Sequence, residues 1–201
     1  MDHILRAISF IFHPLLMPFL GAVFYFSKTP RYIPEEQIYA KLFSLGILTI
    51  LLPILLYFLL KTLKRVDSFH LESTRERRLP LLLNLGIVIL VLARVLTRTE
   101  IPELYFFFMG ILISTVTCLI LAYVNFKASI HMIGSAGFFM FAVAVGIHFK
   151  INIIGTIALM CIILGAIATS RLHVKAHTGL ELIIGFFIGL LPQMLLLQYW
   201  L

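Results

Sequence analysis

The sequence predicts an all-α protein, a polytopic bundle of about six or seven transmembrane helices with its functional site at one membrane face. Hydrophobic residues make up 61% of the 201 residues and charged residues 12%, whereas ordinary globular domains contain roughly 45–50% and about 25%. Seven apolar runs approach the length of a membrane span, and the alternating segments of a barrel are absent. This composition excludes soluble enzymes, disordered regulators and coiled coils, because too little polar surface remains to cover a water-facing body.

The connections between the runs are short, so residues 1–201 are expected to form a single integral membrane domain. The first run contains His13, Pro14 and Pro18 and lacks a signal-peptide cleavage pattern, which predicts a kinked helix that is kept in the protein. The third run is the weakest, because Asn84 and Arg94 interrupt it. The runs cover residues 4–27, 41–63, 80–97, 103–124, 129–148, 151–169 and 178–199.

The net charge is +7. In a chain this apolar, such an excess of cations indicates charged loops, contacts with anionic membrane lipids or a phosphate site, and not nucleic-acid binding. Cys118 and Cys161 both lie inside apolar runs, and no CxxC spacing occurs. We expect both thiols to be buried, and we expect neither a zinc site nor a disulfide. A GxxxG pattern at Gly185 and Gly189 predicts close helix packing within the bundle.

Seven spans place the connections 64–79, 125–128 and 170–177 on one membrane face. Each polar residue there has a common structural explanation, since arginines anchor helices to headgroups and histidines occur at interfaces. The opposite face differs, because acidic residues dilute its cations. The polar residues at the first face are Arg75, Arg77, Arg78, Lys127, Ser129, His131, Ser170, Arg171, His173, Lys175 and His177, with Glu181 one turn into the last span.

Glu181 is costly within a span, by about 2.5–3.5 kcal/mol at the bilayer centre, and is therefore a functional candidate. It follows His177 by four residues, which predicts that both side chains share one face of a helix. The carboxylate would orient the imidazole as a nucleophile or base; a purely structural pair is the alternative. Arginine clusters bind phosphate, and His131 could act as an acid. No Walker loop, HExxH motif or carboxylate cluster is present, so neither metal nor cofactor is expected.

The segment SRLHVKAHTGLE, residues 170–181, resembles the third signature of the phosphatidic acid phosphatase type 2 superfamily, S-R-x5-H-x3-D, with Glu181 in place of aspartate. Residues 129–131 are similar to the P-S-G-H signature but keep only its serine and histidine. The first signature, K-x6-R-P, matches least, because one residue separates Arg78 from Pro80 and Leu71 occupies the lysine position. Arg75, Arg77 or Lys127 could supply the missing charge. The signature-bearing core covers about 75–199.

The resemblance implies a membrane lipid phosphatase that removes phosphate from a lipid phosphate or pyrophosphate without a metal. His177 would form a phosphohistidine while Glu181 holds its ring, and His131 would protonate the leaving group. The resemblance also implies that Arg171 and Arg78 bind phosphoryl oxygens. Ser129, Ser170 and nearby backbone amides would assist them.

Two other functions remain open: a non-catalytic membrane protein that binds or translocates a phosphorylated lipid, and a lipid-linked phosphotransferase. Lys and Arg are more numerous on the site face, which by itself favours the cytoplasm. Setting aside the candidate phosphate ligands and their neighbours reverses this excess. In bacteria, members of the family that the sequence resembles usually have their sites on the periplasmic side. The resemblance therefore favours an inner-membrane protein whose site faces the periplasm. The sequence does not define an oligomeric state.

Overall fold

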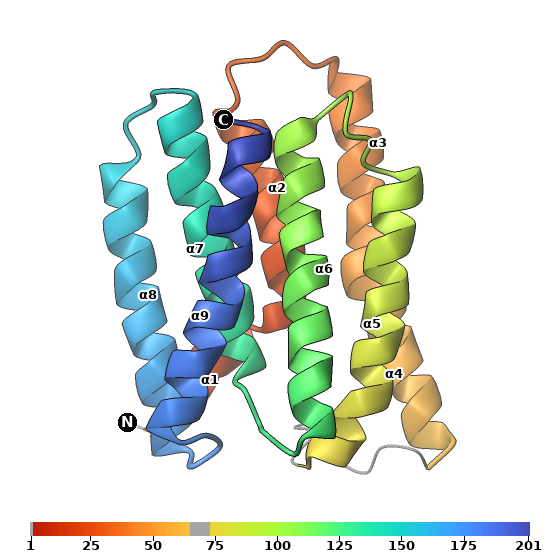
Figure 1. Cartoon of the computed structure of the whole chain (residues 1–201), viewed down its shortest axis with the longest axis vertical. Helices are drawn as coiled ribbons and strands as arrows, with labels where there is room; N and C mark the ends of the chain where they lie inside the picture. Colours follow the sequence, from red (N-terminus) through yellow and green to blue (C-terminus); the bar gives the residue numbers. More distant parts are fainter. Residues whose placement is uncertain (1, 65–72) are drawn as a thin grey trace.

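A computed structural model describes residues 2–64 and 73–201, with side chains from residue 7 onward, and contains helices but no strand within these ranges (Figure 1). The short elements are the 3-10 turns Pro14–Leu16 and Leu197–Tyr199, and a π-helical turn at Ile47–Leu51 that joins α3 to α4. The longer helices are α1 (Asp2–Ile11), α2 (Met17–Lys28), α3 (Glu35–Gly46), α4 (Leu52–Thr62), α5 (Thr74–Arg94), α6 (Pro102–Tyr123), α7 (Ile130–His148), α8 (Ile154–His173) and α9 (Gly179–Leu196).

Six helical segments in the described residues are long and apolar enough to cross a membrane, which confirms the predicted all-α transmembrane bundle. They are Ala7–Lys28, Glu35–Thr62, Pro102–Tyr123, Ile130–His148, Ile154–His173 and Gly179–Tyr199. The third predicted run is the exception. Its helix, α5, is of similar length and lies beside α6 in the bundle (Figure 1), but it carries Arg77 and Arg78 near its start and Arg94 at its end.

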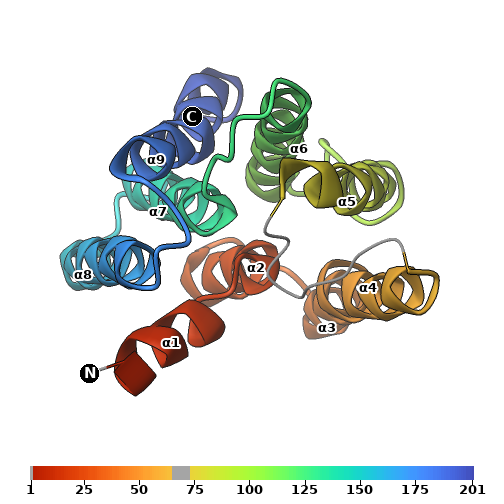
Figure 2. The ribbon, with the colours of Figure 1, turned by 90° about the horizontal axis from the view of Figure 1, so that it is seen from below.

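The predicted kink in the first segment is confirmed at His13. The His13 backbone is extended, with ψ at 135°, and Pro14 starts a 3-10 turn before α2 begins at Met17. This break lets α1 turn away from the axis of α2. Viewed from the end of the bundle, α1 extends from α2 toward α8 (Figure 2).

The helix ends that flank the three polar connections lie at the same end of the bundle, as predicted (Figure 1). However, the helices extend further into them than the sequence indicated. Ser73 caps α5 by accepting a hydrogen bond from the Glu76 N–H, so that Arg77 lies within the helix and not in a loop. At the other connection, α8 continues through Arg171 and ends where Lys175 adopts a left-handed φ of 53°. Arg77 and Arg171 are therefore held by helix ends.

The GxxxG pattern packs α9 onto α7, as expected. A Cβ on Gly185 would lie 2.8 Å from the Ser129 carbonyl oxygen, and one on Gly189 would overlap the Ile133 carbonyl. Because the backbones approach this closely, the Ser129 N–H donates a 3.2 Å hydrogen bond to the Glu181 carbonyl. The start of α7 is thus fixed beside the first turn of α9.

The prediction for the cysteines is half correct. Cys118 is buried in a cluster with Leu81 and Ala122, but Cys161 is exposed. The outer face of α8 also exposes Leu159 and Ile162. Cys161 was predicted to be buried because its neighbours are apolar, but in a membrane helix apolar residues also face lipid.

Candidate functional site

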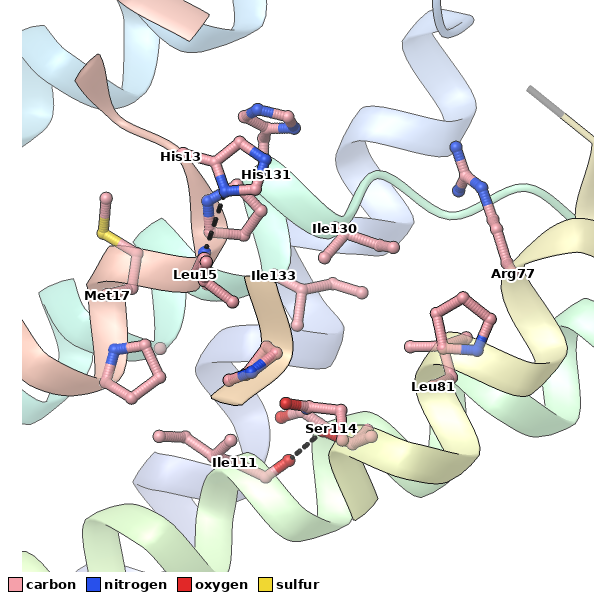
Figure 3. Close-up of a pocket in the computed structure, with 18 of the residues that line it drawn as sticks. His13, Leu15, Met17, Arg77, Leu81, Ile111, Ser114, Ile130, His131 and Ile133 are labelled. Carbon is pink, nitrogen blue, oxygen red and sulfur yellow. Dashed lines mark hydrogen bonds between the residues drawn. The ribbon is translucent and has the colours of Figure 1, made fainter. Parts of the chain in front are cut away.

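A cavity of about 1610 Å³ extends from the end of the bundle that carries the polar connections into its interior. Around its opening lie cationic and histidine side chains from α5, α7 and α8 and the connections beside them. Deeper walls are mainly apolar and include Val88, Phe107 and Ile111, with Ser114 and Gln193 among the few polar residues. Figure 3 shows Arg77 on one side of this space and His131 on the other. The cavity therefore combines a cationic mouth with an apolar interior.

His177 and Glu181 are in contact, but they do not share a helix face as predicted. His177 lies in the connection, Thr178 is the N-cap, and Glu181 is the third residue of α9. In this capping box the Thr178 hydroxyl accepts from the Glu181 N–H, and Glu181 Oε2 accepts from the Thr178 N–H at 2.9 Å. The same oxygen lies 3.0 Å from His177 Nδ1. A glutamate in a capping box extends back across the helix end, and this brings the Glu181 carboxylate to His177.

The contact with Glu181 sets the hydrogen positions on the His177 ring. A carboxylate oxygen only accepts hydrogen bonds, so Nδ1 carries the hydrogen and Nε2 keeps its lone pair. Burial lowers the pKa of His177 below the ordinary 6.5, and the charges of Arg77 and Arg171 lower it further, against the opposing effect of Glu181. The imidazole is therefore neutral at pH 7 and has a nucleophilic nitrogen. His177 lines the cavity.

Two buried arginines line the cavity. Arg171, at the end of α8, is 8% exposed; its Nη1 lies 3.5 Å from Ser9 Oγ, and its Nε is buried without a hydrogen-bond partner among the described residues. Arg77, near the start of α5, is 5% exposed and donates from Nη1 to the Ala128 carbonyl at 3.0 Å. Both charges act on His177. An anion in the cavity would meet two guanidinium groups beside the candidate nucleophile.

The remaining predicted cations, Arg75, Arg78 and Lys127, differ in whether they line the cavity. Arg78 donates to the Ala122 carbonyl at the end of α6, at 3.3 and 3.2 Å, and its guanidinium lies 4.6 Å from the Tyr123 ring centroid. Arg75 is exposed, and neither arginine belongs to the cavity lining. Lys127 does line the cavity. Leu71, at the predicted lysine position, lies outside the described residues.

The serine and histidine of the predicted second signature lie at the start of α7. Ser129 is fully buried, does not line the cavity and has no hydrogen-bond partner for its hydroxyl among the described residues. The Ser129 backbone N–H donates to the backbone carbonyl of Glu181, so this amide is not directed at the cavity. His131 does line the cavity, and its Nε2 lies 3.1 Å from the Ser9 carbonyl oxygen. Ser170 Oγ is 2.7 Å from Ser9 Oγ.

Two residues of the site come from the N-terminal segment and were not predicted. Ser9 contacts Ser170, Arg171 and His131, as described above. His13 lines the cavity, and its ring meets the His131 ring edge-to-face, with centroids 5.5 Å apart (Figure 3). Ser9 and His13 are polar residues within an apolar run, and this feature of the sequence could have indicated a role at the site. Ser9 reaches the site only because α1 turns toward α8.

Within the described residues, no group of three or more His, Cys, Asp or Glu side chains is placed to hold a metal ion. Comparison of the chain with protein-family models, with curated proteins and with solved structures found no significant match.

Proposed function

We propose that this chain is an integral membrane phosphatase of the phosphatidic acid phosphatase type 2 superfamily. It removes phosphate from a lipid phosphate or pyrophosphate through a phosphohistidine. The observation that carries the proposal is the His177–Glu181 pair at the mouth of a cavity lined by Arg77 and Arg171. The pair supplies an oriented nucleophile, and the arginines supply positive charge for phosphoryl oxygens.

The shape of the cavity supports a lipid substrate. Its mouth holds the charged groups, whereas its interior is lined by side chains such as Leu83, Val88 and Phe108 between the transmembrane helices. A phosphorylated lipid has the same division into a charged head and an apolar chain. Burial of the chain in this interior would position the phosphate at the mouth.

The proposed reaction has two displacement steps. His177 Nε2 attacks phosphorus, the P–N bond forms and the P–O bond to the lipid breaks. His131, which becomes protonated when the anionic phosphate binds beside it, gives its proton to the departing oxygen. Water then attacks the phosphohistidine. His131 takes a proton from this water, the P–N bond breaks and inorganic phosphate leaves. Glu181 stabilises the positive charge on the His177 ring throughout.

Phosphate release from a panel of lipids by the purified chain tests the proposal. The panel holds phosphatidic acid, phosphatidylglycerol phosphate and a polyprenyl pyrophosphate. We expect release from at least one of them and loss of release in His177→Ala. His148→Gln changes a histidine at the other end of α7 that does not line the cavity, and this variant should retain most activity. No release from any of these lipids would contradict the proposal.

The depth of the cavity favours a second candidate function. The cavity continues past the mouth to Ser114 and Gln193 in the bundle interior, as a protein that binds or translocates a phosphorylated lipid would require. Binding of the panel lipids without release of phosphate would support this function. A phosphotransferase would instead pass the phosphoryl group to a second lipid or a sugar, which product analysis detects.

We also propose that the chain lies in a bacterial inner membrane with the site facing the periplasm. Val124 and Tyr32 are both exposed. Val124 follows α6, which ends at the site end of the bundle, and Tyr32 lies in the connection between α2 and α3 at the opposite end (Figure 1). In a cysteine-free background, an impermeant thiol reagent should label Val124→Cys in intact spheroplasts, and Tyr32→Cys only after permeabilisation. The reverse pattern would place the site in the cytoplasm.

A further inference from the structure

Ser9 of α1 contacts three predicted site residues at once. Its hydroxyl lies 2.7 Å from Ser170 Oγ and 3.5 Å from Arg171 Nη1. Its carbonyl oxygen lies 3.1 Å from His131 Nε2, which must therefore carry a hydrogen. A single residue from the other end of the chain thus engages the end of α8 and the start of α7.

These contacts use donors that a phosphorylated ligand needs. Arg171 would donate to a phosphoryl oxygen, and His131 Nε2–H would donate to a leaving-group oxygen. While Ser9 accepts from both, neither of these N–H groups is available to a ligand. A phosphate that takes these two hydrogen bonds therefore displaces Ser9 from them, whereas Arg171 Nε, which has no partner among the described residues, is open to it in either case.

The attachment of α1 allows it to move as a unit. It joins the bundle through the extended backbone at His13 and the short turn that follows. Ile8 of α1 and Phe12, which directly follows α1, pack against an apolar cluster that includes Ile167. The outer side of α1 exposes Phe10 at 76% and Ile11 at 58%. Both belong to Ala7–Lys28, a segment apolar enough to cross a membrane, and α1 lies at the edge of the bundle (Figure 2), as expected for side chains that face lipid.

We propose that α1 is a cover on the phosphate site, held closed by Ser9 and displaced when a phosphate group binds Arg171. The inference rests on the proposed function only in requiring an anion at Arg171. While Ser9 is in its observed place, a ligand gains Arg171 Nη1 and His131 Nε2–H only if it provides better partners than Ser9 does. The apparent affinity for phosphate is then reduced by the fraction of molecules that are closed.

A reversible disulfide tests the cover. The full chain carries Ser9→Cys and Ser170→Cys together with Cys118→Ala and Cys161→Ala, and binding of orthovanadate, a phosphate analogue, is followed by calorimetry. Oxidised protein should bind orthovanadate more weakly than reduced protein does, and reduction should restore the affinity. The Ser170→Cys variant without Ser9→Cys should bind equally under both conditions. Failure of the disulfide to form would contradict the Ser9–Ser170 contact on which the cover depends.

The remaining outcomes separate the cover from the proposed function. Equal binding by oxidised and reduced protein would overturn the cover and leave the phosphate site intact. Absence of binding in both states, and in the chain without the Ser9→Cys and Ser170→Cys changes, would overturn the phosphate site and the cover with it.

Removal of the Ser9 hydroxyl provides a second test that needs no cross-link. Ser9→Ala should tighten orthovanadate binding about twofold to tenfold, the factor for loss of one competing hydrogen bond. Ser27→Ala, which removes an exposed hydroxyl at the opposite end of α2, should leave the affinity unchanged. Unchanged or weaker binding in Ser9→Ala would show that Ser9 does not compete with the anion and would overturn the cover.

Discussion

Replacing Glu181 by glutamine separates the two structural roles of this carboxylate. One oxygen accepts from the Thr178 N–H at 2.9 Å to complete the cap of α9, and also contacts His177 Nδ1 at 3.0 Å. Glutamine keeps an oxygen for the cap, since it serves in capping boxes as well as glutamate does. It cannot offer negative charge to an imidazole that becomes positive as its Nε2 attacks phosphorus.

The distance gives the size of the expected effect. Unit charges 3.0 Å apart interact by about 5.5 kcal/mol at an effective dielectric constant of about 20. A transition state that develops roughly half of this charge would lose about 2.8 kcal/mol in the variant, which is close to a 10²-fold fall in kcat. The Glu181 side chain is 18% exposed, so solvent screening reduces the value only in part.

The assay compares kcat for phosphate release with the free energy of unfolding. Glu181→Gln should lose about 10²-fold in kcat at nearly unchanged stability. Thr178→Ala should do the opposite, because it removes the hydroxyl cap, worth about 0.5–2 kcal/mol, and leaves the carboxylate beside His177. A Glu181→Gln enzyme with wild-type kcat would refute the orienting role. The orienting role would also be refuted if, in both variants, kcat fell only in proportion to the loss in the free energy of unfolding.

Three further predictions concern pH, cations and packing. Because burial lowers the pKa of His177 below 6.5, its contribution to stability is fully present above pH 6.5 and is lost as pH falls toward the lowered value. Thermal unfolding at a series of pH values should show this loss, together with an acid limb of kcat/KM below pH 6.5. Arg77→Gln should weaken orthovanadate binding. Arg78→Gln removes contacts to the end of α6 and should lower the free energy of unfolding with little effect on binding. The reverse pattern would show that Arg78, and not Arg77, is the phosphate ligand. Gly189→Ala should destabilise the bundle by about 1–3 kcal/mol by separating α7 from α9, whereas Gly86→Ala, with open space around it, should not; equal effects would contradict the close packing.

The sequence predicted the spans and the shared face well, because both follow from hydropathy and from the alternation of direction between successive membrane helices. Helix ends were predicted less well, since polar residues at a membrane surface suit a loop and a helix terminus equally. Arg171 was therefore assigned to a loop although α8 continues through it. Ser73 at the start of α5 is a capping residue whose signal was not used.

The choice between Arg77 and Arg78 could not be made from the sequence. Consecutive residues on a helix point in directions about 100° apart, so only one of the two faces the cavity. Which one depends on the rotation of α5 about its axis, and packing against α6 sets that rotation. The contact of Ser9 with Arg171 was likewise unpredictable, because it requires α1 to turn at His13 and reach α8.

The measurement that tests the central claim most directly is the identity of the residue that carries the phosphoryl group. The chain is mixed with a radiolabelled lipid phosphate that it hydrolyses, the reaction is quenched in alkali within the first turnover, and the label is mapped by peptide mass spectrometry. The account predicts acid-labile phosphate on His177, and none in His177→Ala. Label on His131, or steady hydrolysis without labelled protein within the first turnover, would contradict it.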